Sequence, residues 1–280
     1  MIVRLTGAFL RALLVALTIV TPALLLPDTA ADTAQVVVLL ALIAGAFVFI
    51  EYYSRYPSII EFRFAPPFNR LRFYAVFLTV LLLTVHRAGE ALDTPVADLF
   101  SAFGRLLSGL LDFPYSPVRL VLLALPEGTP PAMMAEVRDA ASIAYLVALG
   151  LLLCFAWLVK IKGWPGRQGA FNVWLNLPLF DPTGGGDVLA RLKRDSSINI
   201  VLGFLLPFLT PAAFKLVVLV IGPVSITSPQ TLIWVMTAWA IVPANLVMRG
   251  IALHRIAVMI EEKRRRTYEE SKAEEQFQAA

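Results

Sequence analysis

The chain has 280 residues, of which 58% are hydrophobic and 16% charged, and its formal net charge is +4. Soluble globular domains usually have about a quarter of their residues charged and less than half apolar. The apolar residues are therefore too many for an ordinary core, and they lie in runs of about 17 to 25 residues, enough to cross a hydrocarbon layer about 30 Å thick. This composition predicts an all-α, polytopic helical membrane protein and excludes a soluble globular domain or a transmembrane barrel.

Hydropathy predicts six membrane spans, arranged as three helical hairpins. The spans cover about residues 6–26, 36–53, 71–85, 142–159, 198–222 and 231–248, within a transmembrane domain of residues 1–260. The remaining residues, 261–280, are predicted to form a charged cytoplasmic tail. This tail should continue the sixth span as a helix and fray beyond about Tyr268, where the chain becomes polar.

Lysine and arginine are distributed very unevenly between the two sets of loops. Nineteen of the 24 lie at the N-terminal end of the chain, after spans two and four, or after span six. Four lie in the opposite loops, together with nine acidic residues between positions 28 and 139. Because Lys and Arg accumulate in cytoplasmic loops, both termini are predicted to be cytoplasmic. The Ala- and Leu-rich, Lys-poor composition is typical of bacteria, so we expect a bacterial cytoplasmic (inner) membrane.

The outer segment between spans three and four, residues 95–125, is predicted to contain an amphipathic interfacial helix. In residues 95–113 the polar side chains recur every three or four positions, with apolar side chains on the other face. These polar residues are Asp98, Ser101, Arg105, Ser108 and Asp112. The next apolar piece, VRLVLLAL, is too short to span a membrane. It is predicted to be either interfacial or re-entrant.

The inner loop between spans four and five, residues 160–196, contains an apolar patch, a glycine-rich turn and a short basic helix. The sequence DPTGGGDVLARLK could indicate a phosphate cradle at a helix N-terminus. However, the GxxxxGK[ST] pattern of a P-loop is missing. We therefore interpret the segment as a flexible turn in which Asp187 is the N-cap of the basic helix.

The stretch FRFAPPFNRLRF, residues 62–73, alternates aromatic residues with arginines around a Pro-Pro pair. The predicted topology places it on the cytoplasmic side, where its phenylalanines should lie at the interface and its arginines should face phosphates or water. The candidate contacts for anionic lipid headgroups or an acidic partner are Arg55, Arg63, Arg70 and Arg72. The alternative is an anchor that only fixes orientation. Nucleic-acid binding is not expected, because bilayer phosphates are already adjacent.

Three features of the spans bear on chemistry. Lys215 lies inside the fifth span, where a charge is costly. One interpretation is that its side chain snorkels to the interface or has a structural partner. The other is that it lines a pore or binds an anion. Pro207 and Pro211 in the same span should kink or break the helix. Glu51, near the inner end of span two, is expected to pair with Arg55 four residues later.

No cofactor, metal site or catalytic constellation is predicted. His86 and His254 lie at opposite ends of their spans and cannot share a haem. The single cysteine, Cys154, is expected to be a small buried hydrophobe. No Asp or Glu lies in the middle of a span, which argues against a proton-coupled carrier, and no known catalytic motif appears. We expect a protein that is not an enzyme.

Three functions are compatible with these features. The first is a non-catalytic subunit, scaffold or assembly factor of a membrane complex, with a membrane-protein partner or a second copy of itself. The second is a channel or uniporter for a small or anionic solute, centred on Lys215. The third is a lipid-handling protein whose amphipathic outer helix and arginine-rich inner loops contact headgroups.

Overall fold

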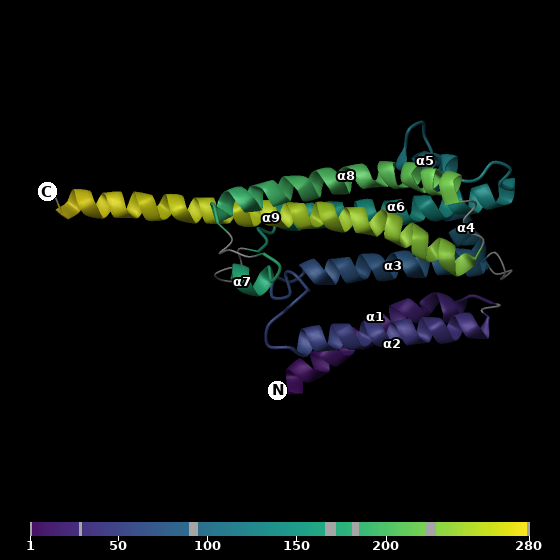
Figure 1. Ribbon diagram of the computed structural model, residues 1–280, viewed down its shortest axis with the longest axis horizontal. Coiled ribbons are helices and arrows are strands. Elements are labelled where there is room, and N and C mark those ends of the chain that lie inside the picture. The colour runs from purple at the N-terminus through teal and green to yellow at the C-terminus, as the bar shows by residue number, and fades with distance from the viewer. Residues whose placement is uncertain are drawn as a thin grey trace.

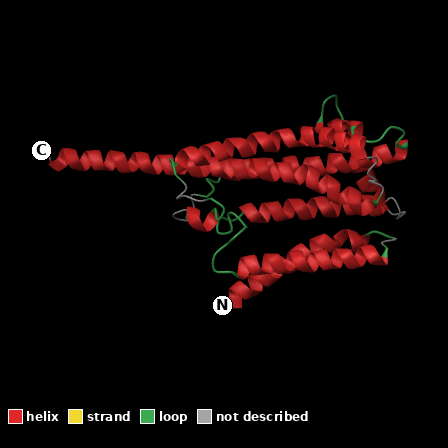
Figure 2. Cartoon of the chain, viewed as in Figure 1, coloured by secondary structure: helices red, strands yellow, loops and turns green. Residues whose placement is uncertain are grey.

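A computed structural model describes residues 2–27, 30–89, 95–165, 172–180, 185–221 and 228–278. Across these ranges the chain forms helices and loops without any strand, as Figure 2 shows. Six of the described helices are long and apolar enough to cross a membrane. The prediction of an all-α chain with six candidate spans is therefore confirmed.

The helices alternate in direction, so that both ends of the chain lie at the same end of the molecule (Figure 1). We call this the termini end. The short α7 also lies there, whereas α4 and α5 lie at the opposite end. The six long helices are α1 (Ile2–Leu25), α2 (Ala31–Tyr53), α3 (Phe68–Gly89), α6 (Pro131–Lys160), α8 (Val188–Ile221) and α9 (Pro229–Gln278). The three short ones are α4 (Pro95–Leu111), α5 (Pro117–Leu123) and α7 (Val173–Asn176).

The core lies where α9 packs between α8, α6 and α3. Among the six candidate spans, α9 is the most buried and α2 the least. The α1–α2 pair lies beside this bundle and touches it mainly through α1 and α3 (Figure 1). The outward surfaces of α1 and α2 carry many exposed leucine and valine side chains, which is expected for helices surrounded by lipid.

Two glycines let α8 and α9 approach one another closely. A Cβ atom on Gly203 of α8 would lie 2.6 Å from the Pro243 carbonyl oxygen of α9. A Cβ atom on Gly250 of α9 would lie 2.8 Å from the Ser196 carbonyl oxygen of α8. The Ser196 hydroxyl donates a hydrogen bond of 2.8 Å to the Gly250 carbonyl at the same contact. Small residues at such crossings allow membrane helices to pack by van der Waals contact.

Of the kink or break expected at the prolines of α8, the break does not occur, because α8 is helical through both Pro207 and Pro211; the kink stays a prediction. Pro211 has no N–H to donate to the carbonyl of Pro207, four residues earlier. The indole Nε1 of Trp239 in α9 donates to that carbonyl instead, at 3.1 Å. A neighbouring helix thus satisfies the acceptor that the proline releases, which is how membrane helices tolerate proline.

Two predicted boundaries at the termini end are wrong. The basic residues 188–195 are not a separate short helix but the first turns of α8, which begins at Val188. Asp187 is the N-cap as predicted, since its Oδ1 accepts from the Leu189 N–H at 3.2 Å. The chain also does not fray at Tyr268, because α9 stays helical to Gln278. The 50 residues of α9 give a length of about 75 Å, more than twice the thickness of a hydrocarbon core.

The outer segment 95–125 forms two helices that pack on the bundle, α4 on α3 and α6, and α5 on α6 and α8. Among the described side chains of α4, Arg105, Leu106 and Leu110 are exposed, whereas Leu107 and Ser108 are buried. The predicted division into a polar and an apolar face therefore does not match which side chains of α4 are exposed and which are buried. The interfacial location itself stays a prediction. The side chains of Asp98 and Ser101 lie outside what the structure describes.

Candidate functional site

The loop between α2 and α3 is docked onto the bundle at the termini end. The backbone N–H of Phe62 donates to the Asn176 carbonyl at 2.7 Å, which ties the loop to α7. The indole Nε1 of Trp164 donates to the Ala65 carbonyl at 3.2 Å, which ties it to the chain after α6. Backbone groups of the loop are thus satisfied by segments about a hundred residues away in the sequence, so its shape depends on the assembled bundle.

Two aromatic rings of this loop, Phe62 and Phe68, are buried, which corrects the expectation that they lie at the membrane interface. Phe62 and Phe68 are only 1% and 2% exposed. They pack with Phe155 and Trp164, with ring centroids between 4.4 and 5.9 Å apart. Burying each large apolar side chain contributes about 1.5–3 kcal/mol. Phe64 is exposed. Phe62 and Phe68 therefore anchor the loop to the bundle, whereas Phe64 does not.

Glu51, at the end of α2, does not pair with Arg55, contrary to expectation. Its carboxylate accepts from the backbone N–H groups of Ser58, Ile59 and Ile60 at 2.7, 2.8 and 3.0 Å. The Ser58 hydroxyl adds a fourth hydrogen bond at 2.7 Å. A carboxylate that accepts several N–H groups is stabilised without a cation. Glu51 therefore shapes the start of the loop.

Arg63 closes the C-terminal end of α2. Its guanidinium donates to the carbonyls of Glu51 and Ser54, which α2 itself leaves without helical partners. Burial lowers the pKa of this guanidinium, the Glu51 carboxylate raises it, and the charges of Arg4 and Arg11 lower it further. Arg4 and Arg11 thus lie close enough to Arg63 to disfavour its positive charge, although only Arg63 belongs to the loop.

These three arginines gather over two adjacent tyrosines. Arg11 and Arg63 lie 4.8 and 5.7 Å from the ring centroid of Tyr52, and Arg4 lies 5.4 Å from that of Tyr53. Such cation–π contacts are favourable, but the charges repel one another. None of the three forms an ion pair with a carboxylate among the described residues. We call Arg4, Arg11 and Arg63 the arginine cluster, a place where an anion would be stabilised.

Arg72 points into the protein, where it joins a polar network between the loop and α9. It donates to the side-chain oxygens of Asn245 at 3.2 Å and Asn69 at 3.3 Å. Beside it, Arg249 of α9 binds the Glu61 carboxylate through two hydrogen bonds of 2.6 and 2.8 Å. Glu61 is only 8% exposed. This ion pair, in which Glu61 is buried and Arg249 is half-buried, fastens the loop to the most buried helix.

The four candidate arginines therefore do not form one surface. Arg55 and Arg70 are exposed, Arg63 belongs to the arginine cluster, and Arg72 belongs to the polar network. Whether any of them contacts lipid or an acidic partner stays a prediction. Sequence reasoning missed Arg4 and Arg11, because nothing in the local pattern shows that α1 brings them to Tyr52.

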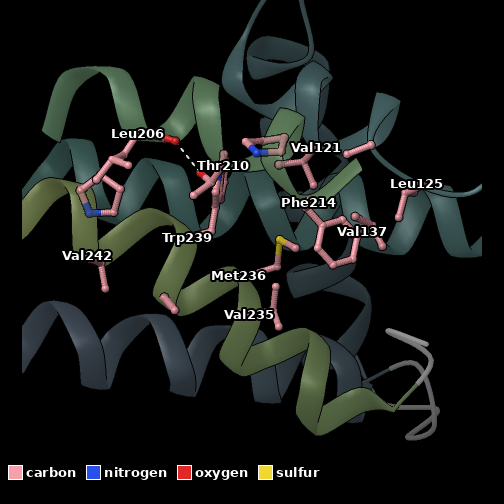
Figure 3. A pocket seen from close by; sticks show the side chains of 14 residues that line it. Val121, Leu125, Val137, Leu206, Thr210, Phe214, Val235, Met236, Trp239 and Val242 are labelled. Atoms are coloured by element: carbon pink, nitrogen blue, oxygen red, sulfur yellow. Dashed lines mark hydrogen bonds between the residues drawn. The ribbon is translucent and has the colours of Figure 1, made fainter. Parts of the chain in front are cut away.

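A cavity of about 410 Å³ lies between α5, α6, α8 and α9. Figure 3 shows side chains from these helices around it, including Phe214 of α8 and Met236 of α9. Its walls are almost entirely apolar. The Thr210 hydroxyl donates to the Leu206 carbonyl, and the Trp239 indole donates to α8, so both groups are already hydrogen-bonded. No sequence pattern indicated this cavity, because its lining comes from four separate segments.

Lys215 is an exposed residue that does not itself line the cavity but is next in sequence to a residue that does. It follows the lining residue Phe214, and its Nζ donates at 3.2 Å to the carbonyl of Leu123 in α5, next to the lining residue Ala124. Leu123 is the last residue of α5, where free carbonyls and the helix dipole favour a cation. Lys215 thus has a structural partner, one of the alternatives considered. Its roles in anion binding or in a channel stay predictions.

The remaining chemically notable residues are dispersed. Cys154 is exposed on the outer surface of α6, which corrects the expectation of burial. His86 is buried, and its ring lies beside Gly104 of α4, close to Asp139 of α6. Within the ranges that the structure describes, no three His, Cys, Asp or Glu side chains come together as a metal-binding group.

The C-terminal part of α9 projects beyond the termini end of the bundle (Figure 1). Two exposed ion pairs join it to the start of α8, Lys193 with Glu261 at 2.8 Å and Arg264 with Asp187 at 3.0 Å. The Arg264 guanidinium holds the pKa of the Asp187 carboxyl below its usual range. Beyond these pairs, the described side chains of residues 265–278 are exposed. We call residues 265–278 the α9 arm.

Comparison of the chain with known protein families, with curated proteins and with solved structures finds no match.

Proposed function

We propose that this chain is an integral protein of the bacterial cytoplasmic (inner) membrane that acts as a non-catalytic subunit, scaffold or assembly factor. Its two termini are proposed to be cytoplasmic, with three hairpins of spans between them. In support, both ends of the chain and the basic segments that flank α2, α3 and α8 lie at one end of the molecule (Figure 1). Lysine and arginine gather on the cytoplasmic side of membrane proteins.

The observation that carries the proposal is the continuity of α9. This helix passes through the core of the bundle and then runs without interruption into the α9 arm. Most residues of the arm are polar, its described side chains are exposed, and such a helix can bridge through solvent to another component. The arm also exposes two large rings, Tyr268 at 70% and Phe277 at 89%. Aromatic side chains are enriched among the residues that dominate protein interfaces.

Site-specific crosslinking tests this proposal. A photoreactive amino acid in place of Tyr268 is expected to give discrete protein adducts in native membranes, because a partner would cover the α9 arm. The matched control is Tyr115, which is also exposed but lies between α4 and α5 at the opposite end. Adducts are read by denaturing electrophoresis and mass spectrometry. Equal labelling at both positions, or no protein adduct at Tyr268, would contradict the proposed role of the arm.

A second candidate function, anionic lipid recognition, is favoured by the arginine cluster. A lipid phosphate beside Tyr52 would relieve the repulsion among the three guanidinium groups. Near a membrane surface each arginine contributes about 1 kcal/mol to anionic lipid binding, so replacing two should weaken binding by about thirtyfold.

Native mass spectrometry measures this effect directly. The variant Arg4→Gln/Arg11→Gln is expected to retain far less phosphatidylglycerol than the wild type, with phosphatidylcholine retention unchanged. The control is Arg194→Gln, an exposed arginine near the start of α8 that already pairs with Asp195. If both variants lose anionic lipid equally, the arginine cluster is not a specific lipid site and acts only through the overall positive charge of the protein.

A further inference from the structure

We propose that the cavity between α5, α6, α8 and α9 binds one acyl chain whose anionic headgroup pairs with Lys215. The inference is independent of the scaffold function, since the cavity lies toward the α5 end of the bundle and the α9 arm projects from the termini end.

The apolar lining of the cavity favours a hydrocarbon ligand. Its volume of about 410 Å³ falls within the range of about 300–1,000 Å³ that is usual for ligand sites. The polar groups of Thr210 and Trp239 are already hydrogen-bonded to carbonyls of α8. A polar solute would therefore lose its hydrogen bonds to water without replacement. An acyl chain loses none, and it is slender enough for a space that is too small for a helix about 10 Å across.

The ammonium group of Lys215, beside the cavity, favours an anionic headgroup. An ammonium group has three hydrogen-bond donors, and the described residues supply Lys215 with one acceptor, the Leu123 carbonyl. The neighbours of this contact, Phe214 and Ala124, both line the cavity. A chain lying against these two residues would bring its headgroup to the ammonium. A phosphate or carboxylate there would complete the hydrogen bonding and neutralise a charge that is costly inside a membrane span.

The simpler alternative is that Lys215 only caps α5 and that ordinary bilayer lipid fills the recess. The two alternatives differ in their dependence on headgroup charge. Bulk lipid would enter in proportion to its abundance, whereas a site completed by Lys215 would prefer an anionic headgroup over a neutral one with the same chain. The preference is expected to be about fivefold, which is the upper range for an incompletely buried ion pair.

Trp239 in the cavity wall provides the measurement. The whole protein is reconstituted in phosphatidylcholine nanodiscs, and lipids with brominated acyl chains are titrated in, because bromine quenches tryptophan on contact. Brominated phosphatidylglycerol should quench the tryptophan fluorescence at about fivefold lower mole fraction than brominated phosphatidylcholine. The Trp239→Phe variant identifies which part of the signal comes from the cavity. A third titration, with a brominated fatty acid, distinguishes a free carboxylate from a phospholipid headgroup.

Four variants test the proposal. Lys215→Leu should abolish the preference for anionic lipid, and Lys215→Arg should retain it. Ala238→Leu narrows the cavity and should reduce quenching at least severalfold, whereas Cys154→Leu, on the outer surface of α6, should not change it. Thermal unfolding verifies that each variant is folded. If Ala238→Leu does not fold, Lys215→Leu, which changes an exposed side chain, still decides between the alternatives. Equal quenching by both brominated lipids in the wild type would overturn the proposal and show bulk lipid contact only.

Discussion

Replacing Arg249 with leucine is expected to lower the free energy of unfolding by about 3–5 kcal/mol, because the Glu61 carboxylate would remain buried without its partner. Both carboxylate oxygens of Glu61 accept from Arg249, at 2.6 and 2.8 Å. The carbonyl of Glu61 also accepts from Asn69 at 2.7 Å, which holds the loop so that the carboxylate cannot easily turn to solvent. Equilibrium unfolding in mixed micelles measures the change.

The chain offers a matched control for this ion pair. Lys193 and Glu261 lie 2.8 Å apart, but both side chains are exposed, so Lys193→Leu should cost at most about 1 kcal/mol. The double variant Glu61→Gln/Arg249→Leu should be less destabilised than Arg249→Leu alone, since it leaves no buried charge. If Arg249→Leu costs no more than Lys193→Leu, the buried pair does not fasten the loop to α9.

Gly203→Ala is expected to destabilise the protein by about 1–3 kcal/mol, the usual cost of overpacking a close contact. The added Cβ would lie 2.6 Å from the Pro243 carbonyl oxygen and 2.8 Å from the Val247 nitrogen. Both are backbone atoms of α9, so no side chain can rotate away and the helices must separate. The loss is measured by the same unfolding experiment.

Gly150 of α6 is the natural comparison, because a Cβ atom there meets no atom within 4 Å. Gly150→Ala should therefore stabilise the helix by up to about 1 kcal/mol through helix propensity alone. The two identical substitutions are thus predicted to have opposite signs. A shared sign would mean that the crossing of α8 and α9 is not as close as the structure shows.

The destabilisation expected for Arg249→Leu and for Gly203→Ala arises in both cases at α9, which links the membrane bundle to the α9 arm. The ion pair with Glu61 holds it at the level of the α2–α3 loop, and Gly203 and Gly250 hold it against α8. Loosening either contact should reduce crosslinking through the α9 arm even though the arm itself is unchanged. That outcome would couple the packing of the bundle to the proposed scaffold function through one helix.

The amino-acid sequence alone determined the class of this protein and its six candidate membrane helices. Those features follow from the local density of apolar residues and the fixed rise of an α-helix. The N-cap at Asp187 could also be predicted, because it depends on its immediate neighbours. The ends of α8 and α9 could not be predicted as well from the sequence, because packing and ion pairs extend helices beyond their apolar segments.

Only the tertiary structure decided which residues meet. The arginines of α1 lie over Tyr52, Glu61 binds Arg249, and Trp239 supplies the hydrogen bond that Pro211 withholds from its own helix. Each of these contacts joins residues far apart in the chain, so no local pattern encodes it. The aromatic–arginine stretch 62–73 shows the difference most clearly. Its residues resemble an exposed motif, but long-range packing buries Phe62 and Phe68 because Phe155 and Trp164 lie where they can cover them.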